Sequence, residues 1–198
     1  MKMNVKDVMK KYDITANGYD ELYQEEQGIK YLSAWKIISN MKGKVIDIGC
    51  GTLLLERFMS AYGTIERIDY IVGLDISERM LLIGLAKVSS DERINSKLDI
   101  VRGDASMLPF RSSSFDFAVS FTVFTLLPIE AIGIIEMDRV ARRGGVFTML
   151  KKFCRLPLDR KYETIGETDK DLIFVLKKEI NSKGELGEGS DKKIDDDS

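Results

Sequence analysis

The sequence contains no histidine in 198 residues. Histidine is the side chain whose ordinary pKa lies closest to neutral pH, and it is the commonest protein ligand of transition metals. Its absence removes the usual general base, every histidine-based catalytic triad and most transition-metal sites. Chemistry on this chain must therefore depend on a cofactor that arrives already activated, and we expect no metal centre.

Cysteine and long apolar runs are scarce as well. Cys50 and Cys154 stand apart, so we expect neither a disulfide framework nor a structural zinc site. No run reaches the roughly 18 to 20 apolar residues that a membrane span requires. Residues 1–13 also lack the apolar core of an export signal. We therefore expect a cytoplasmic protein without a membrane span.

Charge is nearly balanced overall, with a formal net charge of −2, but it is distributed unevenly. Residues 179–198 carry seven acidic and three basic side chains, include several glycines and offer little apolar surface to bury. Such a segment is typical of a disordered acidic tail. The remaining residues, 1–178, are enough for one domain with one core and too few for two.

Strand-like and helix-like runs alternate in strict turn along most of this domain, which predicts a parallel sheet with helices on both faces. Strands are expected at residues 44–48, 68–74, 97–102, 115–121 and 146–151, and helices at residues 28–41, 54–62, 78–88 and 129–141. Residues 162–167 and 171–176 are too close together for a helical crossover and should form an antiparallel hairpin. The predicted fold is a Rossmann-like, doubly wound α/β sheet of seven strands, mostly parallel, that ends in this hairpin.

The strongest motif is VIDIGCGT, residues 45–52, in which an apolar strand ends in an acid and is followed by a glycine turn and a helix. Gly49 and Gly51 allow a tight turn and let a ligand approach the backbone closely. The carboxylate of Asp47 stands just before this turn. A glycine turn also serves ordinary packing of a strand against a helix, so this motif alone does not establish a ligand site.

Three further motifs stand at strand ends. Asp75 ends the second strand, where a carboxylate can accept both hydroxyl hydrogens of a ribose. Ser77 directly precedes the next helix and is the better helix cap, which leaves Asp75 for a ligand. The third strand is followed by Gly103, Asp104 and Ala105, and the fourth ends at Ser120 and Phe121. Because ligands of open α/β sheets bind at the carboxyl edge, these motifs predict one shared site.

In this order the motifs resemble the class I S-adenosylmethionine-dependent methyltransferases, and in particular methyltransferase domains of the type 11 kind. The resemblance covers about residues 12–178 and implies S-adenosyl-L-methionine as the cofactor. It also implies that Asp47, Gly49, Cys50 and Gly51 hold the methionine part, Asp75 the ribose and Asp104 the adenine, with Ile76 and Ala105 flanking the ring and the Ser120 backbone touching the cofactor. Leu53 departs from the family pattern, because many relatives have a third glycine there, so a slightly reshaped pocket is expected.

The segment YDITANGYDELY, residues 12–23, resembles the element that covers the cofactor in several of these families. By that resemblance Tyr19 would close over the methionine end of the cofactor. The aromatic residues of an ordinary amphipathic helix would give the same pattern, and the sequence does not separate the two.

A sulfonium methyl group is electrophilic without further activation, so the protein needs to hold donor and acceptor in line and exclude water. If the acceptor is an amine or a hydroxyl, its proton must leave. Without histidine, the base is a carboxylate, a tyrosinate or water. The sequence leaves these three alternatives open.

RNA, either tRNA or rRNA, is the acceptor that we expect first. A dense basic segment surrounds the fifth strand, and a basic surface there suits phosphate backbones. Its members are Arg139, Arg142, Arg143, Lys151, Lys152, Arg155, Arg160 and Lys161, with Asp159 the only acid between them. A solvated charged loop is an equally simple interpretation.

A partner subunit is a further hypothesis. Residues 80–88, MLLIGLAKV, are apolar around nearly the whole circumference of a predicted helix, whereas an edge helix needs only one apolar stripe. Excess apolar surface often marks a partner site. The short chain also resembles RNA or protein methyltransferases that are stabilised by a small zinc-binding activator subunit at the sheet edge, and this resemblance implies a partner of the same kind.

Three other functions remain in view. A small-molecule methyltransferase with a quinone or lipid-like acceptor is favoured by the apolar run at residues 121–135, which can line a greasy pocket. A dinucleotide-dependent oxidoreductase is disfavoured, because its fingerprint needs a third glycine where Leu54 stands. A non-catalytic scaffold is disfavoured because Asp47, Asp75 and Asp104 are all present.

Overall fold

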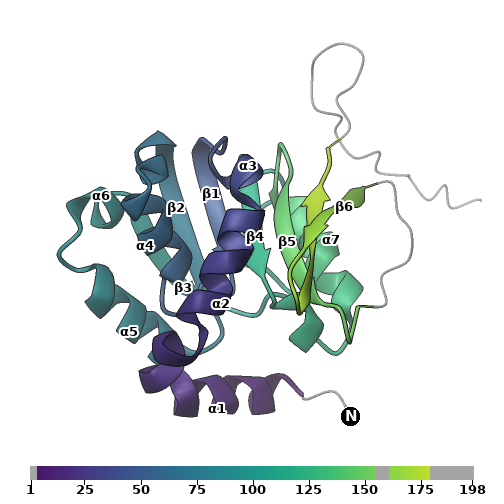
Figure 1. Ribbon diagram of the computed structural model, residues 1–198, viewed down its shortest axis with the longest axis horizontal. Coiled ribbons are helices and arrows are strands. Elements are labelled where there is room, and N and C mark those ends of the chain that lie inside the picture. The colour runs from purple at the N-terminus through teal and green to yellow at the C-terminus, as the bar shows by residue number, and fades with distance from the viewer. Residues whose placement is uncertain (1–3, 155–160, 179–198) are drawn as a thin grey trace, which may run out of the picture.

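A computed structural model of the protein describes residues 4–154 and 161–178. Its strands are β1 (Gly43–Ile48), β2 (Ile68–Asp75), β3 (Leu98–Arg102), β4 (Phe117–Phe121), β5 (Gly145–Leu150), β6 (Tyr162–Glu167) and β7 (Asp171–Leu176). They form a seven-stranded sheet in the order β3-β2-β1-β4-β5-β7-β6 (Figure 1). β1 to β5 run parallel, and β7 lies antiparallel between β5 and β6. The predicted doubly wound sheet with a closing hairpin is confirmed.

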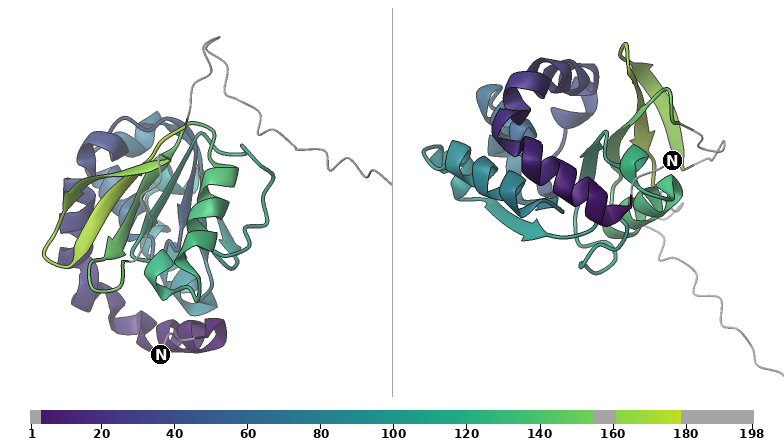
Figure 2. Two further views of the ribbon diagram at one scale, coloured as in Figure 1. Left: turned by 90° about the vertical axis from the view of Figure 1, so that its right-hand side faces the viewer. Right: turned by 90° about the horizontal axis from the view of Figure 1, so that it is seen from below.

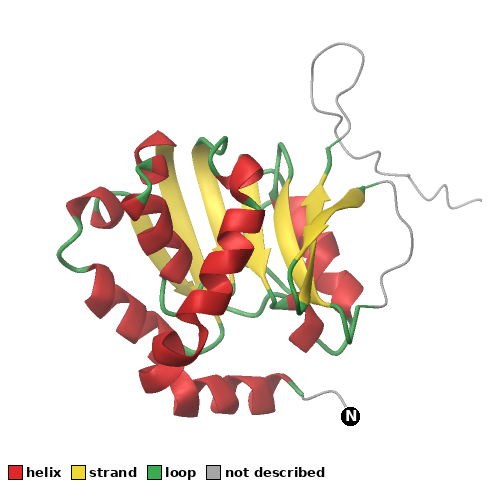
Figure 3. Cartoon of the chain, viewed as in Figure 1, coloured by secondary structure: helices red, strands yellow, loops and turns green. Residues whose placement is uncertain are grey.

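Helices cover both faces of this sheet (Figure 2 and Figure 3). They are α1 (Val5–Thr15), α2 (Tyr19–Ser33), α3 (Trp35–Ile38), α4 (Leu54–Ala61), α5 (Glu78–Val88), α6 (Glu92–Asn95) and α7 (Glu130–Val140), with short 3-10 turns η1 (Ala16–Gly18), η2 (Thr64–Arg67) and η3 (Phe124–Leu126). The helices α2 to α6 pack on one face and α7 on the other. The helix α1 crosses the end of the sheet instead of packing on a face (Figure 1).

The two faces of the sheet build two separate cores, because successive residues of a strand point to opposite sides. In β1, Val45 packs with Ile38 and Leu55 on one side, while Ile46 packs with Met137 of α7 on the other. All five of these side chains are fully buried or nearly so. This double core fixes the positions of the strand ends, where the predicted site residues stand.

The helices differ from the prediction in several places, and α1 and α6 were not predicted. The helix expected at residues 28–41 is split into α2, which begins earlier, and the short α3, with Ala34 between them outside helical geometry. Asp20 and Glu21 in the first turn of α2 favour the earlier start, because acidic side chains stabilise a helix N-terminus. Residues 103–116, between β3 and β4, form no helix, so strand and helix do not alternate strictly. Pro109 and the serines at 112–114 favour turns there.

Some expectations fall outside the described residues. These are the disordered acidic tail at 179–198 and the two basic residues Arg155 and Arg160. The extent of the domain, residues 1–178, therefore stays a prediction. Across 4–154 and 161–178, none of the helices combines the length and the apolar character needed to cross a membrane.

Leu53, where the family pattern has glycine, adopts a left-handed backbone with φ of 59°. Such a backbone costs a side-chain-bearing residue about 1–3 kcal/mol. The Leu53 side chain is nevertheless fully buried, in space that Gly73 of β2 and Gly84 of α5 leave open. A Cβ atom at Gly84 would lie only 2.8 Å from Leu53 Cγ. Burial of Leu53 between these glycines offsets the backbone strain.

Two glycines inside helices give a matched test of this packing. Gly28→Ala in α2 meets open space and should stabilise the protein by about 0.5–1 kcal/mol, since alanine loses less backbone entropy on folding. Gly84→Ala in α5 should destabilise it by about 1–3 kcal/mol, because the new methyl group would crowd Leu53 and the backbone of Thr52. Chemical denaturation measures both free energies of unfolding. Equal effects of the two substitutions would contradict the packing described.

Candidate functional site

A cavity of about 310 Å³ lies between the carboxyl ends of the parallel strands and the helices α1 and α2. Its wall contains most of the residues that the sequence predicted, namely Tyr19, Gly49, Gly51, Asp75, Ile76, Asp104 and Ala105. A smaller chamber of about 20 Å³ shares part of this wall and is lined by Asp47 and Cys50. The acidic and glycine-bearing strand tips therefore converge on one place.

Ser120 is the predicted residue that lies outside both cavities. It is fully buried in β4, and its Oγ donates a hydrogen bond to the backbone oxygen of Ile48 at 3.0 Å. The next three residues, Phe121, Thr122 and Val123, line the larger cavity instead. The fourth strand thus reaches the cavity through residues just beyond the one predicted.

The glycine turn after β1 is shaped by its neighbours. Gly49 has φ of 81°, and a Cβ atom there would fall 2.1 Å from Val123 Cγ2, so no side chain fits. The backbone N–H groups of Gly49 and Cys50 both donate to the carbonyl oxygen of Leu74, at 2.6 and 3.0 Å. A Cβ atom placed at Gly51 would have Tyr19 Cε1 as its nearest neighbour, 4.0 Å away. The space beside Gly51 is therefore open, and it belongs to the larger cavity.

Asp75, at the tip of β2, is tied to this turn. Its Oδ2 accepts a hydrogen bond from Gly51 N at 2.9 Å, and its Oδ1 accepts one from Ser77 N at 2.8 Å. Burial raises the pKa of Asp75, and these backbone N–H groups partly oppose the shift. Ser77 caps α5 as expected, because its Oγ accepts from Met80 N at 3.1 Å. Each oxygen of Asp75 keeps a second lone pair for a ribose hydroxyl.

Asp104 follows β3 on the same edge. Its Oδ1 accepts hydrogen bonds from the backbone N and from Oγ of Ser106, at 2.8 and 2.7 Å. Both bonds orient the carboxylate through one oxygen, which leaves the lone pairs of the other oxygen for a donor such as an exocyclic amino group. Ile76 and Ala105 also line the cavity and supply apolar wall. This end of the cavity therefore suits a flat, partly polar ring.

Three tyrosines cover the opposite wall. The rings of Tyr12 and Tyr19 are 6.2 Å apart between centroids, and those of Tyr19 and Tyr23 are 4.8 Å apart. Burial raises the pKa of Tyr12 to about 12, and burial together with Tyr12 raises the pKa of Tyr19 still further. Tyr12 and Tyr19 therefore stay protonated at neutral pH. They can exclude water from the cavity, but neither can serve as a tyrosinate base.

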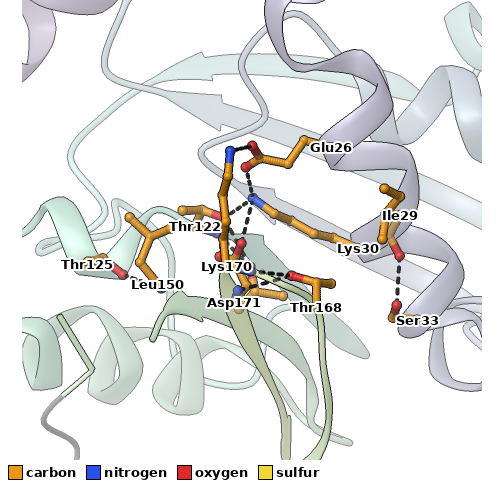
Figure 4. A network of polar contacts seen from close by, with 11 residues as sticks. Glu26, Ile29, Lys30, Ser33, Thr122, Thr125, Leu150, Thr168, Lys170 and Asp171 are labelled. Carbon is orange, nitrogen blue, oxygen red and sulfur yellow. Dashed lines mark hydrogen bonds and ion pairs between the residues drawn. The ribbon is translucent and has the colours of Figure 1, made fainter. Parts of the chain in front are cut away.

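A polar network closes another part of the wall (Figure 4). Lys30 Nζ donates to Glu26 Oε1 at 2.9 Å and to Thr122 Oγ1 at 2.7 Å. It also lies 3.1 Å from Asp171 Oδ2, and the side chains of Lys30 and Asp171 are 1% and 0% exposed. Lys170 Nζ donates to Glu26 Oε2 at 2.6 Å nearer the surface. The network joins α2, the end of β4 and the hairpin turn around the cavity.

The basic residues that the sequence grouped together are dispersed. Ion pairs hold Arg139 with Glu136, Arg142 and Arg143 with Asp116, Lys151 with Glu167 and Lys161 with Asp138. Arg142 and Arg143 stand just before β5, at the amino edge of the sheet and opposite the cavity. The prediction that these two arginines contribute to a basic surface for the acceptor is therefore wrong. They stand between the end of α7 and the start of β5, and both of these ends lie at the edge of the sheet opposite the cavity.

The apolar helix α5 is partly covered by the chain itself. The helix α1 and the turn η1 both pack against α5. Polar contacts fix this arrangement, because Ser77 Oγ donates to Asp13 Oδ1 at 2.5 Å and Arg79 Nη2 donates to Asn17 Oδ1 at 3.1 Å. Leu82 remains 59% exposed. Packing against α1 and η1 therefore accounts for much of the apolar surface of α5.

Several cavity residues were not predicted from the sequence, among them Glu26, Gln27, Lys30 and Leu150. Gln27 and Lys30 are buried within a helix whose other residues are mostly polar, and no local signal separates them from their exposed neighbours. Thr122 has φ of 64°, which the sequence does not indicate. The one sequence signal for Leu150 is that it ends an apolar strand, and β1, β4 and β7 also end in apolar residues.

Comparison with known proteins gives consistent results. Residues 46–149 match the family model described as Methyltransferase domain. A demethylmenaquinone methyltransferase of Staphylococcus aureus (strain MRSA252) is 28% identical over 159 residues, which cover 76% of this chain and 62% of that protein. The chain therefore spans less than two thirds of the length of that relative.

Solved structures share the fold. A protein of Methanococcus maripaludis described as an S-adenosyl-L-methionine-dependent methyltransferase aligns with a TM-score of 0.61 at 20% identity, over 83% of this chain and 93% of that one. A structure of the Haloferax volcanii Trm112 methyltransferase activator in complex with a methyltransferase aligns with a TM-score of 0.54 at 24% identity, over 70% of this chain and 58% of that one. These similarities establish the architecture.

Removal of one partner of the buried ion pair between Lys30 and Asp171 should lower the free energy of unfolding. Lys30→Met should destabilise the protein by about 3–5 kcal/mol, because it leaves Asp171 buried without its cation. The double variant Lys30→Met/Asp171→Asn should recover most of this loss. Lys170→Met, at a side chain 64% exposed, should cost no more than about 1 kcal/mol. Urea denaturation measures all three, and a double variant as unstable as Lys30→Met would contradict the account.

Proposed function

The chain belongs to the methyltransferase domain family, and we propose that it transfers a methyl group from S-adenosylmethionine to a small acceptor with an apolar body, quinone-like or lipid-like. The observation that carries this proposal is the make-up of the larger cavity. Polar groups for an adenosyl cofactor stand along the tips of β1 to β3, while the part next to β4 and β5 is mainly apolar. A nucleic acid would require a basic, open surface there.

The residues present fit the cofactor. The ribose hydroxyls would donate to Asp75 and the adenine amino group to Asp104, with Ile76 and Ala105 on either side of the ring. At Gly51 the backbone faces the cavity, so an amino-acid tail can approach it. When bound, the cofactor supplies an electrophilic methyl group. The chain's own residues bind and orient the two reactants, and the tyrosines of α1 and α2 exclude water.

The acceptor would lie against Leu126, Leu127, Pro128 and Leu150, beside the polar network. Glu26 is a carboxylate that reaches this part of the wall. Burial alone would raise the pKa of Glu26, but the ammonium groups of Lys170 and Lys30 outweigh burial and lower it. Glu26 is therefore ionised at neutral pH and can accept a hydrogen bond from an acceptor hydroxyl. Of the three bases that the sequence leaves open, the carboxylate of Glu26 and water are compatible with this wall, whereas Tyr12 and Tyr19 stay protonated.

RNA with an activator subunit is the second candidate. The observation that favours a partner is the free side of β3, which pairs only with β2 among the described strands. An unpaired edge strand can add a strand from another protein. The Haloferax neighbour is a methyltransferase in complex with such an activator. The ion pairs of the basic residues and the enclosed apolar wall favour the small acceptor over RNA.

A transfer assay separates the two candidates. The full chain is incubated with methyl-labelled S-adenosylmethionine and either a lipid extract containing quinols or total cellular RNA. The proposed function predicts label in the lipid fraction. Label in RNA alone would overturn the small-molecule assignment, and Asp75→Asn provides the background for both arms.

Asp75→Asn should weaken binding of S-adenosylmethionine about 10- to 100-fold, because the amide nitrogen places a donor against a backbone N–H and loses an acceptor for the ribose. Asp99→Asn is the control, since Asp99 is exposed on β3 and lines neither cavity. Titration calorimetry gives both affinities. Equal affinities of the two variants would argue against the ribose role of Asp75.

A further inference from the structure

The first half of α7 carries isoleucines on its outside, next to the larger cavity. Ile129, Ile132 and Ile135 are 59%, 36% and 62% exposed. A spacing of three residues places them along one side of the helix. They directly follow residues 126–128, which line the cavity. Apolar surface therefore continues from the wall of the cavity onto the outside of α7.

Two loops extend this surface. Met107 is 77% exposed, and the backbone N–H of the residue after it donates to Glu136 Oε2 at 2.7 Å, so its loop runs beside α7. Phe153 is 46% exposed in the turn after β5. Leu150 N donates to Thr125 Oγ1 at 3.2 Å, which ties the start of that turn to η3, just ahead of α7. We call the exposed side chains of both loops and of α7 the apolar patch: Met107, Ile129, Ile132, Ile135 and Phe153.

Lysines lie beside the patch and the cavity. Lys152 is exposed, and its Nζ lies 5.5 Å from the centroid of the Phe153 ring. Lys10 and Lys11 of α1 are exposed as well, and Lys11 lines the same cavity as residues 126–128. Within the described part of the chain, none of the ion pairs involves these three lysines. Their charges are therefore available to an anionic partner.

The acids of the same elements do not offset these charges. In α7, Glu130 is buried, and Glu136 and Asp138 are engaged in ion pairs with basic side chains. The helix α1 carries one exposed acid, Asp7, against three exposed lysines. The surface formed by the patch and these lysines is thus apolar and, on balance, positively charged.

We propose that the apolar patch and the lysines beside it dock on the anionic surface of a lipid bilayer, and that the acceptor enters the larger cavity from that bilayer past residues 126–128. The inference rests on the proposed function, because it names where the acceptor comes from. Exposed apolar side chains flanked by lysines suit a surface that presents anionic headgroups above acyl chains. An acceptor with an apolar body is dissolved in those acyl chains rather than in water.

A second copy of the chain suits the patch less well. A two-fold axis through the patch would bring the same lysines of both copies together, and like-charge repulsion opposes that arrangement. A stable protein interface also involves roughly 20 to 30 residues on each side. A few inserted apolar side chains together with lysines are enough for reversible binding to an anionic bilayer. The small size and the charge of this surface therefore favour the bilayer.

Sedimentation of the full chain with lipid vesicles tests the docking without the cofactor. The vesicles consist of phosphatidylcholine alone or of phosphatidylcholine with about one third phosphatidylglycerol, which supplies the negative charge. Binding to the anionic vesicles should be at least about 10-fold stronger, because several lysines contribute. It should weaken when sodium chloride is raised from roughly 0.05 M to roughly 0.5 M, since salt screens exposed charges.

Matched variants locate the surface that binds. Ile132→Ser/Ile135→Ser should weaken binding to the anionic vesicles about 10-fold, because less apolar area is inserted. Leu82→Ser is the control, since Leu82 is 59% exposed on α5, across the sheet from α7. Lys152→Gln should weaken binding about 5-fold. Lys36→Gln should leave it unchanged, because α3 lies at the other end of the sheet from α1 (Figure 1). Urea denaturation checks that all variants are folded.

Methyl transfer to quinols in two forms tests the entry of the acceptor. Ile132→Ser/Ile135→Ser should lose most of the transfer to quinols held in anionic vesicles and keep the transfer to quinols dispersed in detergent, because these isoleucines do not line the cavity. An equal loss in both forms would overturn entry from the bilayer.

Other outcomes are equally decisive. Absence of binding to anionic vesicles, or equal weakening by Leu82→Ser and the isoleucine variant, would overturn the docking. A dimer in sedimentation velocity that Ile132→Ser/Ile135→Ser dissociates would assign the patch to a second copy and overturn it as well. Failure to bind vesicles, with label still found in the lipid fraction of the transfer assay, overturns this inference alone. Label in RNA alone overturns the proposed function, whatever the vesicles show.

Discussion

The hydrogen bond from the Gly51 backbone N–H to the Asp75 carboxylate joins the turn after β1 to the tip of β2. The two strands are parallel neighbours, so both ends lie at the same edge of the sheet. The strand order reverses between β1 and β4, because β2 and β3 follow on one side of β1 and β4 and β5 on the other, and a ligand crevice forms at such a point. Asp75 and the glycine turn thus define one wall of the cavity, and the rest of the site is arranged around them.

The sequence predicted this wall because its signals are local. A short apolar run predicts a strand, and an acid or glycine at its end marks where the strand ends. The parallel arrangement then brings Asp47, Asp75 and Asp104 together without any further information. Ser120, whose backbone was predicted to touch the cofactor, shows the limit of such reasoning, since the residues that line the cavity begin one position later, at Phe121, and no local signal marks that position.

The opposite wall depends on contacts between distant residues. Lys30 and Thr122 are 92 positions apart, and Asp171 comes from the closing hairpin. A helix with many charged residues gives no sign of which of them will be buried, because burial depends on the partner that tertiary structure supplies. The same limit applies to the basic residues around β5. Their concentration in the sequence indicated a patch, but Arg142 and Arg143 pair with Asp116 at the far edge.

The residues around the cavity differ in whether they fall within the part of the chain that matches the family model. Residues 46–149, which match the family model, include the strand tips that we assign to the cofactor. The tyrosines of α1 and α2, Lys30 and the hairpin residue Asp171 lie outside that match. The strand tips that would bind the methyl donor and the apolar residues Leu126 to Pro128 therefore lie within the match, whereas the tyrosines and the buried ion pair that close the cavity lie outside it.

Hydrogen–deuterium exchange with and without S-adenosylmethionine tests the central claim most directly, because it reports each backbone amide separately. If the strand tips and the N-terminal tyrosines enclose the cofactor, slower exchange should appear at residues 12–30, 49–51, 75–77 and 104–106. The amino edge of the sheet, at residues 141–145, should exchange unchanged. Protection confined to that edge, or no protection at the glycine turn at saturating cofactor, would contradict the account.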